Sequence, residues 1–453
     1  MKPRTKDPKD QQSPRRPKSP IGSCVLTGLL IFFVLCAAII GLYVAQNRRI
    51  AITVPAPVVP NPNAFDELIR IGLLTKAMKH KSPPNMLVPY PQTETFSNYQ
   101  TSALEFEPIR QKLRSVFGKP CLHPVVRFNG VAMPSYGPLR ETARALSGEA
   151  RYYEIVGRPG KAVEIRLDGF EMSPMIQRGG PLIAFLVARA IESISGTGLE
   201  DDLPLLSDVE LAAAARRLDR IISQYPRFSD TIREEGNYTT SATAASLNSE
   251  TTIKERYENM RQLADVDEGH RPNFSQAWKM AKYTLSNKEA MLRDNQAYFE
   301  ELAKDYDRPF AGPSKVRVPD NLLANWFSMI SENSPARHAG SIAAVRLLRV
   351  EVALYRYRKA SGRFPDRLDA LVPRLLGTIP TDPFGGDSKP SFIYKPLKNG
   401  AAYLLYSIGP DMKDDGGTAS KSPGIAGAGD IVAGKIWNPT RRFKPSSLKP
   451  LTR

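Results

Sequence analysis

The feature that most constrains this chain is a stretch of 25 residues without charge, residues 21–45. At about 1.5 Å per residue, a helix of this length measures roughly 37 Å and can cross a hydrocarbon core of about 30 Å. Seven Lys and Arg residues precede the stretch, whereas only Arg48 and Arg49 follow it closely. Because basic residues stay on the cytoplasmic side of a span, we expect a single-pass protein with a cytoplasmic N-terminus.

A cleaved signal peptide is the alternative interpretation of residues 21–45. Its apolar core normally measures about 7–15 residues and is followed by a small-x-small cleavage site. This stretch is longer, and the best candidate site would place Tyr43 where a small residue belongs. We therefore expect an uncleaved anchor in the bacterial inner membrane, with the lipid bilayer as a partner and the C-terminal domains outside the cytoplasm.

Composition restricts what the rest of the chain can be. Hydrophobic residues make up 42% and charged residues 24% of the 453 residues, which is typical of globular domains. Three Cys exclude a disulfide scaffold, and Cys121 is the only thiol beyond the apolar stretch. We expect a packed Cys121; a free or intermolecular thiol is the alternative. The net charge of +17 favours an acidic partner or an anionic surface.

The remaining pattern divides the chain into six segments. They are a basic disordered cytoplasmic tail (1–20), a transmembrane helix (21–45), a Pro-rich linker (46–62), a helical domain (63–333), an α+β module (334–437) and a basic disordered tail (438–453). The expected fold class is mainly α with a small α+β C-terminal module, a helix plus a short antiparallel sheet. Four Pro within 51–62 predict a stiff extended spacer that lifts the ectodomain off the bilayer.

Both tails are basic, which favours anionic partners. Residues 1–20 are rich in Lys, Arg and Pro and would lie against anionic lipid head groups. They lack aromatic residues and a folded reader, so we expect no nucleic-acid partner. Residues 438–453 contain five Lys and Arg and no acid; this tail either contacts anionic lipid or envelope polymer or ends free in solvent.

Helical periodicity dominates residues 63–333. Apolar residues spaced by three and four predict a helix over 138–157, from Leu139 to Tyr153, with a second helix after the turn at Arg158. Further helices are expected over 182–194, over 210–225 with Arg216, Arg217 and Arg220 on the outer face, and over 274–306 as one long helix. Residues 226–272 are polar, and we expect a long loop with at most one helix. An ordinary bundle is expected; irregular repeat-like helix pairs are the alternative.

The C-terminal segment begins with a helix over 334–360, with Arg346, Arg349 and Arg356 facing outward and Gly362 as its C-cap. A short helix over 366–376 should follow. Two strands, 392–395 and 402–407, flank Asn399-Gly400, a dipeptide typical of β-hairpins. A last strand is expected over 431–437.

A series of ordered matches in residues 336–437 resembles the C-terminal half of the major pseudopilin of type II secretion. The matching residues are Gly362, Phe364, Pro365, Leu368, Leu371, Asp382, Pro383, Phe384, Gly385, Tyr394, Tyr403, Ser407, Gly409, Pro410, Asp411, Asp430, Ile431 and Trp437. The prepilin-peptidase pattern of that family is missing around Gly22, so pilus-shaft packing is not expected. The whole arrangement is also similar to large sets of single-pass membrane proteins of planctomycete-like bacteria.

The acidic loop of this module is the best candidate for a site. The pseudopilin resemblance implies that the loop binds calcium, with Asp411 and Asp430 as ligands and Asp414 or Asp415 adding charge. The spacing does not fit an EF-hand, because Lys413 and Ser422 occupy ligand positions. The alternative is a solvated turn whose Asp side chains accept hydrogen bonds from their own backbone.

Motifs for catalysis are weak. We expect Glu200-Asp201-Asp202 to lie in a solvated loop, the four His residues share no spacing, and no Ser occupies a nucleophile elbow. We therefore expect no enzyme but a non-catalytic interaction or structural protein of the envelope, with envelope or secretion proteins as partners. The alternative is a hydrolase-type envelope enzyme whose site lies between helices of the middle domain. A deep polar pocket would favour the enzyme, and a flat surface with an apolar patch would favour the interaction protein.

Overall fold

The structure is a computed structural model that describes residues 30–38, 41, 49–80, 93–124, 127, 133–249, 252–267, 270–321, 333–386, 391–419 and 429–437. The predicted tails 1–20 and 438–453, and most of the predicted span 21–45, lie outside these residues. The described chain is mostly helical with one three-stranded antiparallel sheet, which confirms the expected fold class at this level.

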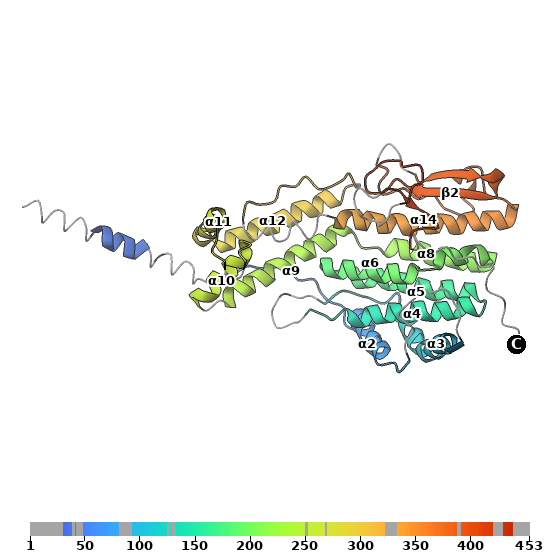
Figure 1. The fold of residues 1–453 in the computed structure, drawn as a ribbon, viewed down its shortest axis with the longest axis horizontal. Helices are drawn as coiled ribbons and strands as arrows, with labels where there is room; N and C mark the ends of the chain where they lie inside the picture. The colour runs from blue at the N-terminus through green and yellow to red at the C-terminus, as the bar shows by residue number, and fades with distance from the viewer. Residues whose placement is uncertain are drawn as a thin grey trace, which may run out of the picture.

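The main body is a layered helical bundle (Figure 1). Its helices are α2 (Ala64–Lys76), α3 (Thr93–Arg114), α4 (Gly137–Ile155), α5 (Pro159–Gln177), α6 (Leu182–Gly196), the short α7 (Leu199–Asp202) and α8 (Asp208–Gln224). The predicted stripe on α4 is confirmed, since Leu139, Ala143, Leu146 and Ala150 are fully buried. Asn63 caps α2, since its side chain accepts the backbone N–H of Phe65.

A long helical hairpin extends from this bundle (Figure 1). It consists of α9 (Phe228–Ser249) and α12 (Lys288–Tyr306), and its tip carries α10 (Ile253–Leu263) and α11 (Phe274–Leu285). We call α9 and α12 the hairpin, and α10, α11 and the adjoining helix ends the hairpin tip. Two predictions were wrong here, because residues 226–272 hold two helices rather than a long loop with at most one helix, and 274–306 is two helices rather than one.

Both corrections have a local physical cause. The buried face of α9 consists largely of small and hydroxylated residues such as Gly236, Thr239 and Ser241, which leave no apolar stripe to recognise. A Cβ on Gly236 would lie 2.6 Å from the Cβ of Phe299 on α12, so the close approach of the two helices requires glycine. The long helix breaks before α12, where the Asn287 side chain accepts the backbone N–H of Ala290.

The C-terminal module contains α14 (Ser334–Ser361) and the sheet, whose strand order is β1 (Ile393–Leu397), β2 (Ala402–Ser407), β3 (Ile431–Val432). The predicted β-hairpin of β1 and β2 is confirmed, since Asn399 and Gly400 both have positive φ and Lys395 pairs with Leu404. The helix expected over 366–376 is only a 3₁₀ turn, Leu368–Leu371. The last strand ends at Val432, because the chain turns at Gly434, whose φ is 80°.

Helix α14 lies on the bundle and shares one hydrophobic core with it. Val345, Leu348 and Val352 of α14 pack in a cluster with residues of α5 and α8. Arg349, expected to face outward, is instead buried and donates to Asp219 of α8 at 2.7 Å. The predicted C-terminal module is therefore joined to the helical domain by a continuous interior.

Two segments are apolar enough to consider as spans. By length and composition the stretch Leu182–Leu205 could cross a membrane, but its Leu182, Phe185 and Ile191 side chains are buried against neighbouring helices. Of the predicted N-terminal span, residues 30–38 are described; they are helical, with exposed apolar side chains such as Leu30 and Phe33. Figure 1 shows this short helix at the end of the long axis beyond the hairpin tip.

Candidate functional site

The four predicted calcium ligands lie in one loop beside β2 and β3. Asp430 is fully buried and its carboxylate accepts the backbone N–H of Gly417 at 2.7 Å and of Asp415 at 3.4 Å. Asp414 accepts the Tyr406 hydroxyl at 2.8 Å, and Asp411 accepts the N–H of Lys413 at 3.2 Å. Burial, opposed by these backbone hydrogen bonds, raises the pKa of Asp430.

These carboxylates do not form a ligand cage as they are placed. Asp411, Asp414 and Asp430 each accept a backbone N–H of the loop itself, and Asp415 contributes its backbone N–H and C=O. Among the described residues, no group of three or more His, Cys, Asp or Glu is arranged to hold a metal ion. The loop geometry matches the turn alternative, and calcium binding stays a prediction.

The calcium prediction has a direct test by thermal unfolding. If the loop binds calcium, removing the ion with a chelator should lower the melting temperature of the full-length protein, and Asp411→Ala should abolish that difference because it removes a carboxylate ligand. Asp366→Ala, an exposed acid on the same module, is the matched control and should keep the difference. Equal melting temperatures with calcium and with chelator would reject the site.

A buried polar cluster surrounds Glu192 of α6. Its carboxylate accepts hydrogen bonds from Ser173 at 2.6 Å, from Ser341 at 2.6 Å and from Tyr225 at 2.5 Å. Arg189 forms an ion pair with Glu192 at 2.9 Å. Side chains from α5, α6, α14 and the end of α8 thus converge on one carboxylate, which ties these four elements together.

His338 lies beside this cluster but does not complete a catalytic set. Its ring stacks on Phe228 at 5.1 Å and lies 5.9 Å from Phe185. Burial, and secondly the charge of Arg189, lowers the pKa of His338 to about 3, so the ring is neutral at physiological pH. Both nearby serines donate to Glu192 rather than to His338. The cluster therefore lacks the nucleophile–base contact that hydrolysis requires.

The acidic run at 200–202 was predicted as a solvated loop, and this prediction was wrong. These residues form α7, and Glu200 and Asp202 are buried. The Glu200 carboxylate accepts the backbone N–H of Gly434 at 2.8 Å and of Ile436 at 3.2 Å. Glu200 therefore caps the turn that follows β3, a partner 234 residues away in the chain.

Glu200 also meets a second buried carboxyl, that of Glu351 on α14. Glu351 accepts the Tyr403 hydroxyl at 2.7 Å and interacts directly with Glu200. Burial raises the pKa of Glu351 to about 7, and burial together with the Glu351 charge raises the pKa of Glu200. Burial of two neighbouring carboxyl groups disfavours their ionisation, so the pair keeps a proton at pH values where an exposed Glu has lost it.

The other titratable candidates do not converge. Cys121 is buried, as expected, and burial raises the pKa of its thiol to about 12, which makes it a poor nucleophile. His123 contacts the Tyr136 hydroxyl at 2.7 Å inside the bundle, whereas His80 is exposed beside Glu105. Arg217, predicted on an outer face of α8, instead points inward and pairs with Asp168 of α5.

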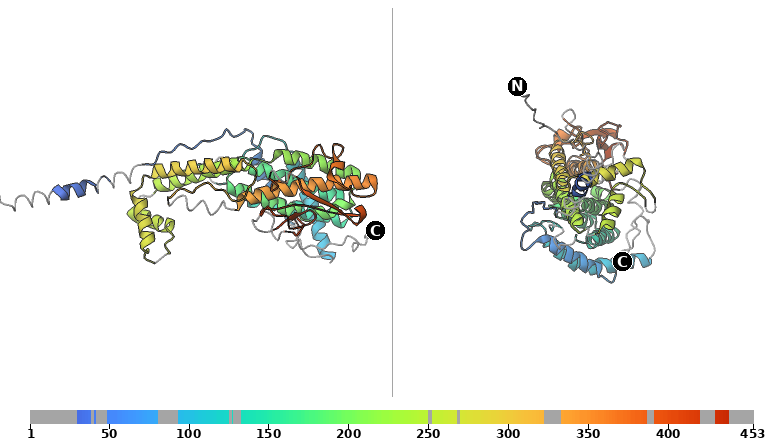
Figure 2. Two further views of the ribbon diagram at one scale, coloured as in Figure 1. Left: turned by 90° about the horizontal axis from the view of Figure 1, so that it is seen from above. Right: turned by 90° about the vertical axis from the view of Figure 1, so that its left-hand side faces the viewer.

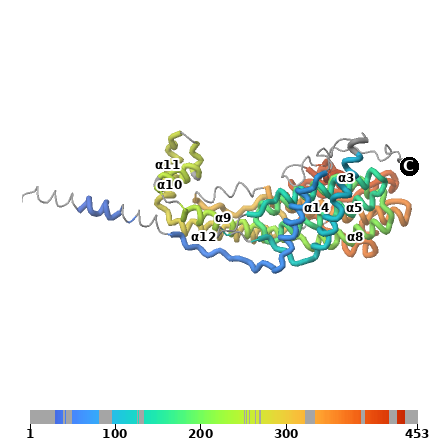
Figure 3. The backbone as a smooth tube through the Cα atoms, turned by 90° about the horizontal axis from the view of Figure 1, so that it is seen from below, coloured from blue at the N-terminus to red at the C-terminus, as the bar shows by residue number. Residues whose placement is uncertain are grey.

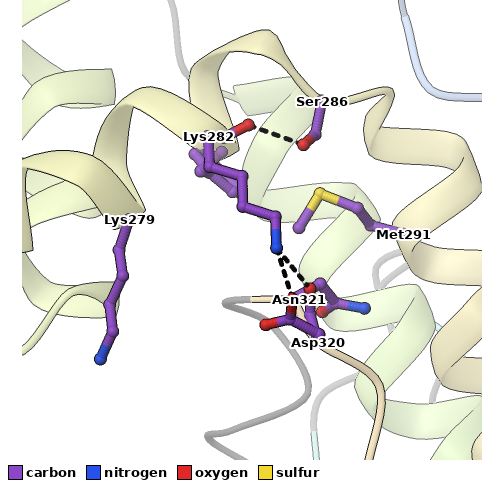
Figure 4. Close-up of a pocket in the computed structure, with 7 residues that line it drawn as sticks. Lys279, Lys282, Ser286, Met291, Asp320 and Asn321 are labelled. Atoms are coloured by element: carbon purple, nitrogen blue, oxygen red, sulfur yellow. Dashed lines mark hydrogen bonds and ion pairs between the residues drawn. The ribbon is translucent and has the colours of Figure 1, made fainter. Parts of the chain in front are cut away.

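A shallow pocket lies at the hairpin tip between α11, α12 and the segment that ends at Asn321 (Figure 4). The lining residues are Lys279, Lys282, Tyr283, Ser286, Met291, Asp320 and Asn321. The Lys282 amine is 2.5 Å from a carboxylate oxygen of Asp320, and Figure 4 shows Lys279 pointing away from this pair. The pocket offers one exposed ion pair on an amphipathic helix, with no nucleophile and base in contact among its described residues.

The hairpin tip also contacts the segment that begins at residue 49. Asn248 near the end of α9 exchanges two hydrogen bonds with the backbone of Ile50, at 2.9 and 3.1 Å. Glu289 of α12 accepts the N–H of Ala51 at 3.2 Å, and Arg127 donates to the carbonyl of Pro55 at 2.8 Å. The Pro-rich linker is extended, as predicted, but it lies along the hairpin rather than standing free (Figure 3).

Comparison with protein-family models, with curated proteins and with solved structures gave no match. What the molecule does must therefore come from its own geometry. Sequence reasoning missed two features of that geometry, the carboxyl pair Glu200–Glu351 and the exposed face of α11. The exposed face of α11 did have a signal in the sequence, since Phe274, Trp278 and Leu285 recur on one helical face. The prediction of one long helix through Tyr306 instead assigned these residues to a core.

Proposed function

We propose that this protein is a single-pass protein of the bacterial inner membrane whose ectodomain is a rigid, non-catalytic stalk. The stalk would hold the pseudopilin-like α+β module away from the bilayer and present it to envelope or secretion proteins. One observation carries the proposal: the chain enters the ectodomain at the hairpin tip, and the sheet lies at the opposite end of the long axis (Figure 1).

The entry point supports a tether at one end. Ile50 and Ile52 pack into the apolar cluster of the hairpin tip together with Met280 and Leu292. Residue 49 is only four residues beyond the predicted span, so a membrane-crossing helix would end close to this tip. The chain then runs along the hairpin and begins α2 in the main body (Figure 3).

The helix lengths support a stalk of useful reach. Helix α12 has 19 residues and α14 has 28, and Figures 1 and 2 show them following each other along the long axis. At about 1.5 Å per residue they cover roughly 70 Å. That distance exceeds the thickness of a lipid bilayer and would carry the sheet well clear of the membrane surface.

The contacts between module and bundle support rigidity. Besides the shared core, Trp437 packs edge-on against Phe170 of α5 at 5.3 Å. A Cβ on Gly196 would lie 2.4 Å from the Trp437 ring, so this docking depends on a glycine in α6. Ion pairs of Arg349 with Asp219 and of Arg356 with Asp208 join α14 to α8 along their length.

Membrane anchoring has a test with a matched control. We expect full-length protein to stay in the membrane pellet after alkaline carbonate washing, and protease added to intact spheroplasts to remove the module. Leu30→Arg with Phe33→Arg should release the protein, because each central Arg costs about 2.5–3.5 kcal/mol of insertion free energy. Leu73→Arg with Leu74→Arg, on exposed α2 positions, should not.

Two outcomes would reject this proposal. One is recovery of the wild-type protein in the carbonate supernatant. The other is a mature N-terminus that lies beyond residue 45, which would show that the apolar stretch is removed as a signal peptide. Survival of the module in protease-treated spheroplasts, followed by its digestion after lysis, would place it on the cytoplasmic side and would also overturn the orientation.

A further inference from the structure

Helix α11 is amphipathic with its apolar face turned outward. Its inner face packs Met280 and Tyr283 into the hairpin tip, where they are 7% and 4% exposed. Phe274, Trp278 and Leu285 are 89%, 67% and 70% exposed. At 100° per residue these three side chains fall within about 40° of one another around the helix. Within the described residues, nothing covers this face.

Such a face is unusual for a surface helix. Single exposed hydrophobic residues are common, but three large ones on one helix, including Phe and Trp, mark a contact surface. Lys282 and Lys279 follow this face on one side of the helix, and Lys279 is exposed and points away from the Lys282–Asp320 ion pair (Figure 4). Aromatic and Leu side chains on one face with Lys beside them are typical of helices that lie in the interface of an anionic bilayer.

The position of α11 indicates what covers it. The hairpin tip is where Ile50, just beyond the predicted span, joins the body. Figures 2 and 3 show α10 and α11 projecting sideways from the hairpin at this end, across the long axis along which the helix of residues 30–38 leaves. A helix that crosses the bilayer along this axis would bring α11 to the membrane surface, roughly parallel to it.

We propose that α11 lies in the interface of the anionic cytoplasmic membrane as a second attachment beside the anchor. Phe274, Trp278 and Leu285 enter the boundary between head groups and acyl chains, and Lys279, which points away from the Lys282–Asp320 pair, lies among lipid phosphates. This proposal rests on the N-terminal anchor proposed above. It gives the stalk two fixed points at its base, which would hold it at a defined angle to the membrane instead of letting it swing on a linker.

The test uses the full chain in vesicles of phosphatidylcholine and phosphatidylglycerol that carry bromine on the upper acyl carbons. The protein contains three Trp, and brominated lipid quenches only indoles that reach the acyl region. We expect part of the fluorescence to be quenched, and this part to disappear in Trp278→Phe. Trp437→Phe is the matched control, because Trp437 packs against Phe170; this variant should keep the quenched part.

The other outcomes of this test distinguish failure of the α11 attachment from failure of the anchor. Absence of quenching in protein that resists carbonate extraction overturns the α11 attachment and leaves the anchor intact. Release by carbonate overturns the anchor itself. If a second copy of the chain covers α11, quenching is absent and the protein forms dimers that Trp278→Asp separates, which also overturns the membrane attachment. Trp278→Phe should unfold at the wild-type temperature, because the side chain it changes is exposed.

Discussion

Replacing Asp168 with Ala should cost the fold about 1.5–3 kcal/mol, because it removes the shared anion of two partly buried guanidinium groups, which keep only Glu164 and Glu171 as partners. Asp168 is fully buried on α5. Its carboxylate accepts Arg114 of α3 at 2.9 Å and Arg217 of α8 at 2.5 Å. One carboxylate therefore joins three helices that are far apart in the chain. The measurement is the free energy of unfolding from urea titration of the full-length protein in detergent.

The control for this experiment is an ion pair of the same chemistry on the surface. Glu141 and Arg144 pair at 2.5 Å on α4, with side chains 29% and 55% exposed. Glu141→Ala should cost no more than about 1 kcal/mol, because solvent replaces the lost partner. A similar loss for both variants would show that Asp168 acts as an ordinary surface charge.

The helices with large apolar stripes were predictable from the sequence, and the reason is local. The stripe on α4 repeats at the helical period, and the residues that form it are the ones that the structure buries. The β-hairpin at Asn399-Gly400 was equally predictable from the sequence, since the turn needs positive φ at both positions. These features depend on residues that are close in the sequence, so a single sequence is enough to predict them.

What escaped prediction depends on partners that are remote in the chain. The arginines at 217 and 349 look like outer-face residues until Asp168 and Asp219 are seen opposite them. The burial of Glu200 follows from the N–H groups of Gly434 and Ile436. No periodic pattern of residues in the sequence predicts such long-range pairs. The face of α11 does recur at the helical period, but its outward orientation depends on the break before α12 and on packing against that helix.

Glu351→Gln should stabilise the protein at pH 8 by about 1–3 kcal/mol and remove much of its pH dependence. Glu351 is buried and its pKa is raised to about 7, above the ordinary value of 4.5. The folded state thus binds more protons than the unfolded state between these values. The contribution of Glu351 to stability is therefore complete below about pH 4.5 and is lost as the pH rises through 7. In this variant the new amide oxygen can still accept the Tyr403 hydroxyl, and the new NH₂ group can donate to the Glu200 carboxylate.

Melting temperatures at pH 5 and pH 8 separate this effect from a general change in stability. The wild type should melt lower at pH 8, and Glu351→Gln should narrow that difference, whereas the exposed Glu301→Gln on α12 should behave like the wild type. Glu351→Leu should lower the melting temperature at both pH values, because it strands the Glu200 carboxyl and the Tyr403 hydroxyl. A wild type that melts equally at the two pH values would contradict the raised pKa of the buried carboxyl pair of α7 and α14. The carboxyl pair would then stabilise the position of the module through packing alone, without a pH-dependent contribution.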